Sequence, residues 1–246
     1  MRVFISLVLL SAFSMLSAMT ATEIITQVDK NARGKTVQMT LSVEIQRPTW
    51  SRTIEMKSWG KGTEYSLVYI TAPAKEKGQA FLKRQNELWN WIPSIGRMIK
   101  MPPSMMSQSW MGSDFKNDDL VKESSVVKDY HHELLGVETK DGFECYKIKL
   151  SPKNEVAVIW GKIITWVSKK DFIQIRGEFY DEDEELIHTQ VASEIKKMGG
   201  RIIATQMEII PSENPNQKTI MKIKSALFDE PISDGFFSQR QLKRIR

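Results

Sequence analysis

"KTVQMTLSVEIQRP", residues 35–48, alternates apolar and polar side chains almost without interruption. The apolar positions are Val37, Met39, Leu41, Val43 and Ile45. Successive side chains of a β-strand point to opposite faces, so this pattern predicts one long strand with a single apolar face. That apolar face has to be covered by another part of the chain, or else line a cavity.

Similar segments follow along the rest of the chain, separated by turn residues such as Asp141-Gly142 and Gly199-Gly200. They predict roughly ten or more strands, mostly joined as hairpins, in a mainly β fold with a few helices. An antiparallel sheet of this size curls into a barrel or half-barrel. Residues 22–34 form an amphipathic pattern that predicts a helix capped by Thr22 and ended by Gly34. So little helix leaves a curved sheet that either closes on its own side chains or keeps a cavity.

The first eighteen residues have the layout of a secretory signal peptide. Arg2 is followed by an apolar run over 3–16, and small residues place cleavage between 18 and 21. A buried N-terminal helix is the alternative. No Cys follows the run, so we expect an exported, periplasmic protein without a lipid anchor, whose residues 19–246 form one domain.

The net charge of +5 falls to +4 when Arg2 is removed. The C-terminal segment accounts for this excess with Arg240, Lys243, Arg244 and Arg246. We expect these side chains to face a partner or a membrane, although a solvated chain end is an equal alternative. The near-neutral remainder excludes the broad basic surface that nucleic-acid binding needs.

Motifs for catalysis, cofactors and metals are missing from the sequence. The single Cys145 makes no internal disulfide and no Cys-based metal cluster. Asp114, Asp118 and Asp119 lack the glycine and the bidentate Glu of a calcium loop. We expect instead that Asp118 or Asn117 caps a short helix and that Ser113 and Asp114 shape a turn. The sequence therefore predicts a protein that is not an enzyme and carries no cofactor.

Residues 97–112, "RMIKMPPSMMSQSWMG", are unusually rich in methionine. Pro102 and Pro103 exclude one regular helix or one central strand. Three interpretations stay open for this segment. Thioethers bind Cu(I), but Arg97 and Lys100 oppose a cation and no His is nearby. The side chains could also fill a core, or they could form an adaptable rim around a ligand, because Met repacks easily.

The segment 88–120, "LWNWIPSIGRMIKMPPSMMSQSWMGSDFKNDDL", resembles the LolA-like, outer-membrane-lipoprotein-sorting group of bacterial periplasmic proteins. The segments 47–65, 158–172 and 236–246 are also similar to that group. The resemblance implies an incomplete antiparallel β-barrel whose open side is lidded by helices and loops. It also implies an apolar cavity for acyl chains, without catalytic residues or metal ligands.

A carrier follows from this resemblance, with lipoprotein acyl chains or a free lipid as cargo. Its partners would be a resistance–nodulation–division-type inner-membrane exporter or an outer-membrane acceptor. A ligand-sensing periplasmic regulator on the same fold and a Met-rich copper protein are the alternatives. Exposing a sixteen-carbon chain to water costs ~12 kcal/mol, at ~0.8 kcal/mol per CH₂. Two or three chains would need a cavity near ~1,000 Å³.

The residues expected at this cavity or its lid are apolar and come from the strand over 37–45, its neighbour, and the Met-rich region. They are Val37, Met39, Leu41, Val43, Ile54, Met56, Trp89, Trp91, Met98, Met101, Met105, Met106, Trp110, Met111 and Phe115.

Overall fold

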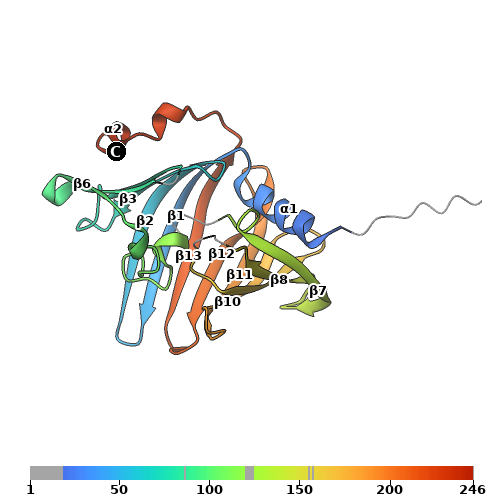
Figure 1. Ribbon diagram of the computed structural model, residues 1–246. Coiled ribbons are helices and arrows are strands. Elements are labelled where there is room, and N and C mark those ends of the chain that lie inside the picture. Colours follow the sequence, from blue (N-terminus) through green and yellow to red (C-terminus); the bar gives the residue numbers. More distant parts are fainter. Residues whose placement is uncertain (1–18, 86, 120–124, 155, 157, 246) are drawn as a thin grey trace, which may run out of the picture.

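The structure, a computed structural model, describes residues 19–245 apart from 86, 120–124, 155 and 157. The expected signal peptide, residues 1–18, and Arg246 lie outside the described residues. Thirteen strands form one antiparallel sheet in the order β6-β5-β4-β3-β2-β1-β13-β12-β11-β10-β9-β8-β7. The sheet curves strongly around a hollow side and stays open, with β6 and β7 as its two edges (Figure 1). This confirms the expected incomplete antiparallel barrel.

The elements begin and end as follows. The chain runs α1 (Ala21–Arg33), β1 (Thr36–Arg47), β2 (Trp50–Lys61), β3 (Tyr65–Ala72), β4 (Ala80–Arg84), β5 (Glu87–Ile92), η1 (Pro93–Ile95), β6 (Arg97–Lys100), η2 (Pro103–Met105), β7 (Tyr130–Lys140), β8 (Phe143–Pro152), β9 (Lys162–Ser168), β10 (Gln174–Tyr180), β11 (Leu186–Met198), β12 (Arg201–Pro211), β13 (Lys218–Phe228), η4 (Asp234–Phe236) and α2 (Gln239–Leu242).

Strand β1 is central because it pairs with β2 on one side and with the last strand, β13, on the other. Its alternation places Leu41, Val43 and Ile45 in a buried cluster on the hollow, inner face of the sheet. Each is at most 6% exposed. The alternating pattern of the sequence therefore defines the inner face, as expected.

Helix α1 covers part of the open side, packing Ile24 and Ile25 against the inner face near β7 to β10. Its N-cap is Thr20, which forms a reciprocal capping box with Glu23, whereas the sequence pattern had indicated Thr22. The helix ends at Gly34, whose φ of +61° favours glycine. In the described part of the chain, no helix has the length and apolar character needed to cross a membrane.

The C-terminal segment covers the outer face of one half of the sheet. The C-terminal segment 229–245 crosses the outer side of β2 to β5 and buries Phe237, Leu242 and Ile245 there (Figure 1). These side chains pack with Leu67 and Leu82 of the sheet. The β2–β6 half of the sheet is therefore covered on both faces.

Candidate functional site

A cavity of about 460 Å³ lies between α1, the inner face of the sheet and the segment that follows β6. Most of its wall is apolar, and strands from both halves of the sheet contribute to it. The wall includes Val28 and Ala32 of α1, Val37 and Met39 of β1, Ile163 of β9, Phe179 of β10, Ile203 and Met207 of β12, Met221 and Ile223 of β13, and Phe115, Val126, Tyr130 and Trp160 from connecting segments and the start of β7. A site of this kind suits an apolar ligand of modest size.

One part of the cavity wall carries two adjacent carboxylates, Asp118 and Asp119. The indole Nε1 of Trp160 donates to Asp119 at 3.2 Å, and the backbone N–H of Lys116 donates to it at 2.8 Å. Burial raises the pKa of Asp119 to about 6, although these hydrogen bonds favour the ionised form. Asp119 therefore changes its charge in mildly acidic solution.

Aromatic side chains close the cavity next to this carboxylate. Trp160 lies edge-on to Phe179 with ring centroids 5.4 Å apart, and the ring of His188 stacks on Phe179 at 4.6 Å. Burial lowers the pKa of His188 to about 3, so its imidazole is neutral. Burial also raises the pKa of Tyr130, whose hydroxyl donates to the carbonyl of Trp160 at 3.3 Å. These rings stay uncharged at neutral pH; Tyr130, Trp160 and Phe179 line the cavity, and His188 packs against the latter two.

At the end near the β2–β3 turn, the wall becomes polar. Ser58 of β2 and Ser66 of β3 line it, and Lys83 of β4 donates to the carbonyl of Thr63 at 2.5 Å. A Cβ at Gly60 would come within 3.1 Å of Val37, so glycine keeps this part of the wall open. This end offers hydroxyl and ammonium groups to the polar part of a ligand.

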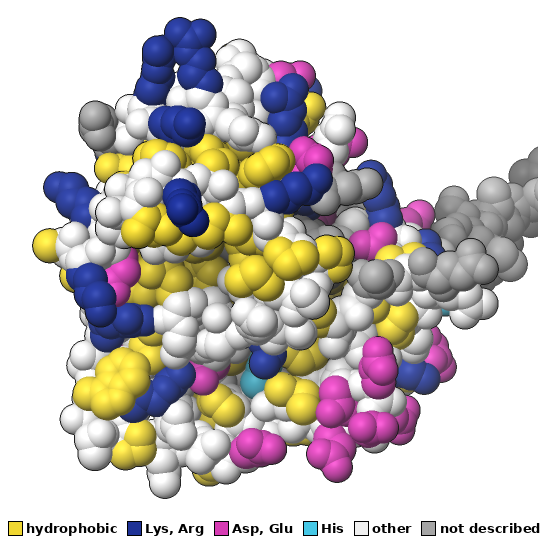
Figure 2. Space-filling model, turned by 60° about the vertical axis from the view of Figure 1, so that its left-hand side comes forward, with side chains coloured by type: hydrophobic (Ala, Val, Ile, Leu, Met, Phe, Trp, Pro, Cys, Tyr) yellow, Lys and Arg dark blue, Asp and Glu magenta, His cyan; other side chains and the backbone are white. Residues whose placement is uncertain are grey.

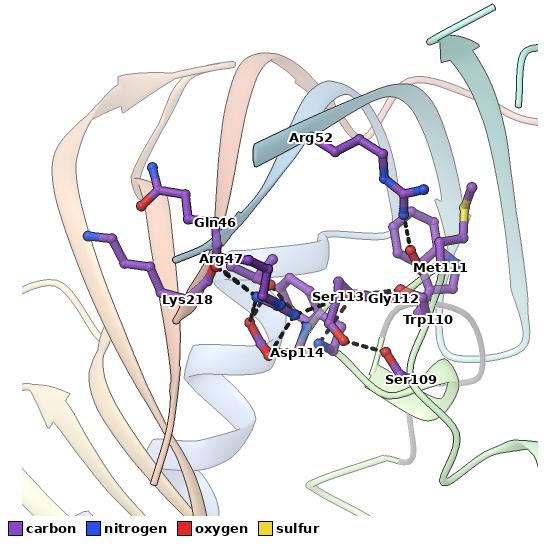
Figure 3. A network of polar contacts seen from close by, with 12 residues as sticks. Gln46, Arg47, Arg52, Ser109, Trp110, Met111, Gly112, Ser113, Asp114 and Lys218 are labelled. Atoms are coloured by element: carbon purple, nitrogen blue, oxygen red, sulfur yellow. Dashed lines mark hydrogen bonds and ion pairs between the residues drawn. The ribbon is translucent and has the colours of Figure 1, made fainter. Parts of the chain in front are cut away.

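Segment 101–119, which follows β6, is fastened to the ends of β1, β2 and β13 (Figure 3). Asp114 accepts two hydrogen bonds from the guanidinium of Arg47, at 3.0 and 3.1 Å, and one from the hydroxyl of Thr219 at 2.6 Å. Arg47 also donates to the carbonyl of Gly112 at 3.1 Å, and Arg52 donates to that of Met111. These bonds tie the segment to the barrel wall.

The apolar side chains in the Met-rich part of this segment fall into two groups by burial. Met101, Met106 and Trp110 are buried in the inner-face core, and Trp110 is fully buried. Met105 and Met111 are partly buried against the same core. The segment thus covers one end of the open side with its apolar side chains already packed.

The residues predicted from sequence for the cavity fall into three groups. Val37, Met39 and Phe115 line the cavity. Leu41, Val43, Ile54, Met56, Met101, Met106 and Trp110 belong to the core beside it, with Met105 and Met111 packed against that core. Trp89, Trp91 and Met98 lie on the outer face under the C-terminal segment, outside the cavity.

The placement of the two tryptophans follows from strand alternation. Leu88 of β5 faces the inner core, so its neighbours along the strand, Trp89 and Trp91, face outward. Met98 pairs with Trp91 across the β5–β6 ladder and therefore shares the outer face. Placing these three residues at the cavity is thus corrected by the structure.

Several wall residues were not predicted from the sequence. Ile203 and Met207 on β12 and Met221 on β13 reach the cavity because the last strands pair with the first. The alternation in "RIIATQMEII" identifies a strand, but not which strand it joins. Val28 of α1 lies on the apolar stripe that was expected to pack on another element, without the sequence indicating which one.

The basic residues predicted at the C-terminus lie at the surface. Arg240, Lys243 and Arg244 are exposed around α2, while Arg246 is outside the described residues. Lys243 holds its ammonium 5.6 Å from the ring centroid of Trp91. The tail is therefore packed onto the protein by its apolar residues, with its charges turned to solvent.

Comparison with solved structures identifies the fold as that of the LolA superfamily. A DUF1329 family protein from Desulfovibrio piger matches with a TM-score of 0.82 and 22% identity, over 90% of this chain and 97% of the other. A LolA superfamily protein from Nitrosomonas europaea matches with a TM-score of 0.79 and 23% identity, over 91% and 100%. A putative outer membrane lipoprotein-sorting protein domain from Vibrio parahaemolyticus gives 0.78 and 21%, over 89% and 97%.

Comparison of the sequence with family models shows the family to which the chain belongs. A family model described only as "uncharacterized protein" matches residues 62–244, and the chain belongs to that family. Comparison with curated protein sequences gives no match. The resemblance to the LolA-like group is confirmed at the level of the fold.

Proposed function

We propose that this protein is a periplasmic carrier that binds an acyl chain of a lipoprotein or of a free lipid inside its cavity. The cavity is the observation that carries the proposal. It is bounded by the sheet, α1 and segment 101–119, and its wall is apolar around Met39, Phe179 and Met221. Water forms few hydrogen bonds with such a wall, whereas an acyl chain is stabilised by ~0.8 kcal/mol for each CH₂ group that moves from water into the cavity.

The volume of the cavity determines how many acyl chains we propose that it holds. If each CH₂ takes roughly 30 Å³, about the share of one water molecule in the liquid, then the cavity holds about fifteen such groups. That is one fatty-acyl chain, and a volume of about 460 Å³ is well below what two or three chains need. A cargo with several chains would need the sheet to open further, or would leave chains outside.

The polar ends of the cavity suggest how such a ligand lies. Ser58, Ser66 and Lys83 form one end, and they suit a carboxylate or ester group. Asp118 and Asp119 form part of the wall elsewhere. We propose that the acyl chain runs from the serine end past Met39 and Met221, and that Asp119, when protonated, gives the chain a less polar wall.

The carrier role rests on the fold as well as the cavity. One neighbour is described as a putative outer membrane lipoprotein-sorting protein domain, and another as a LolA superfamily protein. We extend to this chain the corresponding function, with delivery to an outer-membrane acceptor or to a resistance–nodulation–division-type exporter. The proposed export follows from residues 1–18, and no catalytic step is part of the proposal.

A displacement experiment tests the proposal. An environment-sensitive fluorescent fatty acid is bound to the delipidated protein and then displaced with saturated fatty acids of increasing length. We expect saturable binding at a ratio of one to one, with affinity rising up to about fifteen carbons and then levelling. No saturable binding, or affinity independent of chain length, would contradict the proposal.

A further inference from the structure

The hairpin formed by β5, η1 and β6 projects from the edge of the sheet beyond the rest of the molecule (Figure 1). The hairpin carries exposed apolar side chains: Ile95, in the η1 turn at its tip, is 57% exposed, and Ile99, in the edge strand β6, is 40% exposed. Trp91 of β5 is half-buried on the outer side of the same hairpin. Isolated exposed apolar residues are ordinary, but here two of them lie on one hairpin that projects from the edge of the sheet.

Basic side chains surround this tip. Lys75 and Lys77 lie in the turn between β3 and β4, which packs on the hairpin, because a Cβ at Gly78 would be 3.3 Å from Pro93. Arg97 begins β6, directly after the tip. All three side chains are exposed. Three cations therefore border two apolar side chains on one projection.

The C-terminal helix adds charge of the same sign beside the hairpin. Lys243 lies over Trp91, and Arg240 and Arg244 are exposed on the same short helix. None of these three, nor Lys75, Lys77 or Arg97, forms an ion pair with another residue in the described ranges. The six positive charges are thus available to a partner.

Negative charge near this surface is already engaged or turned inward. Glu76 pairs with Arg52 at 3.5 Å and its side chain is only 14% exposed. Glu87 pairs with Lys100 at 2.5 Å. An acidic turn, 181–185, lies in the other half of the sheet, between β10 and β11. Figure 2 shows the same separation, with basic side chains at the left and top and acidic ones at the lower right.

We propose that this surface binds an anionic phospholipid bilayer, with Ile95 and Ile99 entering the interface and the surrounding Lys and Arg contacting the phosphates. Clustered basic residues are attracted to anionic lipid, and apolar side chains with an aromatic neighbour add insertion into the headgroup region. The charge separation across the molecule orients the hairpin toward such a surface. The inference goes beyond the carrier function, because bilayer binding is measured whatever the cavity contains.

Sedimentation with vesicles tests the surface directly. We expect the protein to bind vesicles of phosphatidylglycerol and phosphatidylcholine more tightly than vesicles of phosphatidylcholine alone, and to lose this preference as salt rises. The triple variant Arg97→Gln, Arg240→Gln, Arg244→Gln should bind roughly a hundredfold more weakly, at about fivefold per basic residue. Ile95→Ser should cost about tenfold. Val137→Ser is the matched control, since Val137 is 50% exposed on β7 at the other edge of the sheet.

Insertion of the tip is measured separately with a dye. The natural Cys145 is fully buried, so a cysteine introduced at Ile95→Cys can be labelled selectively with an environment-sensitive fluorophore. Its emission should shift to the blue on anionic vesicles, whereas that of Val137→Cys should not. Equal binding to both vesicle types, or an unshifted dye at position 95, would overturn the proposal. So would an Ile95→Ser variant that changes self-association in sedimentation velocity but leaves vesicle binding intact, because the surface would then join two copies of the chain.

Discussion

Filling the cavity from its wall should weaken ligand binding without unfolding the protein. Ser58 lies on the inner face of β2 and lines the cavity, between Met39 of β1 and Val68 of β3 in the ladder. Replacing it by Phe sends a ring into open volume, because the side chain points into the cavity and leaves the packed core beside it unchanged. The strand itself tolerates an aromatic residue well.

The size of the effect follows from the volume. A phenyl ring in place of one hydroxyl displaces about four methylene groups of the roughly fifteen that the cavity can hold. At ~0.8 kcal/mol per displaced CH₂, the ligand loses ~3 kcal/mol, or roughly a hundredfold in Kd. A chain shorter by four or more carbons still fits and should lose far less. The variant should therefore shift the preference toward short chains as well as weaken binding of long ones.

The fluorescent fatty acid assay measures both effects. Ser225→Phe is the control, because Ser225 pairs with Thr40 on the outer face of β13 and is exposed. Thermal unfolding of both variants should remain close to that of the parent protein. If Ser58→Phe binds every chain length as tightly as the parent does, the ligand lies elsewhere and the reasoning from this cavity fails.

Three further predictions concern the segment that closes the open side. Asp114→Ala leaves Arg47 without its ion-pair partner at a buried site, since the side chains of Asp114 and Arg47 are 11% and 14% exposed. It should lower the free energy of unfolding, measured by urea denaturation, by ~3–5 kcal/mol. The control Glu55→Ala breaks the exposed pair with Lys224 and should lower it by ~0–1 kcal/mol. Trp110→Ala should lower the free energy of unfolding by ~3–5 kcal/mol. Trp110→Phe should lower it much less, because the indole N–H has no hydrogen-bond partner among the described residues. Equal losses in the two variants would contradict this prediction. Burial raises the pKa of Asp119 to about 6, so folding favours the protonated carboxyl group. The stabilisation that results from this pKa shift is complete below about pH 4 and is lost as the pH rises through 6. Asp119→Asn should flatten this pH dependence of the unfolding midpoint, and an unchanged slope would show that another group causes it.

The strands and the inner face could be predicted from the sequence because the relevant signal is local. Alternation over 37–45 fixes which side chains of β1 share a face, and Leu41 and Val43 are indeed buried together. The packing of the first helix and the antiparallel sheet follow from the same patterns, whereas the open barrel was implied only by the resemblance to the LolA-like group. Local periodicity shows that one face of a strand is apolar. It does not show whether that face packs in the core, lines a cavity or contacts another segment.

That limit explains the misplaced residues. Trp89 and Trp91 lie in a segment rich in apolar residues, but the phase of β5 relative to the cavity depends on its ladder with β4. The outer face there is covered by residues 232–245, which are distant in sequence. The fixed position of segment 101–119 likewise depends on Arg47 and Thr219, which are 67 and 105 residues from Asp114 in the sequence. Contacts between residues so far apart in the sequence produce no periodic pattern from which they could be predicted.

Native mass spectrometry of the protein purified from its own cells, without detergent, tests the proposed carrier function itself. We expect one bound species per protein that contains an acyl chain, displaced by an added fatty acid and depleted in Ser58→Phe but present in Ser225→Phe. A protein that carries no acyl-bearing mass, and that also takes up none from lipid added in excess, would contradict the account.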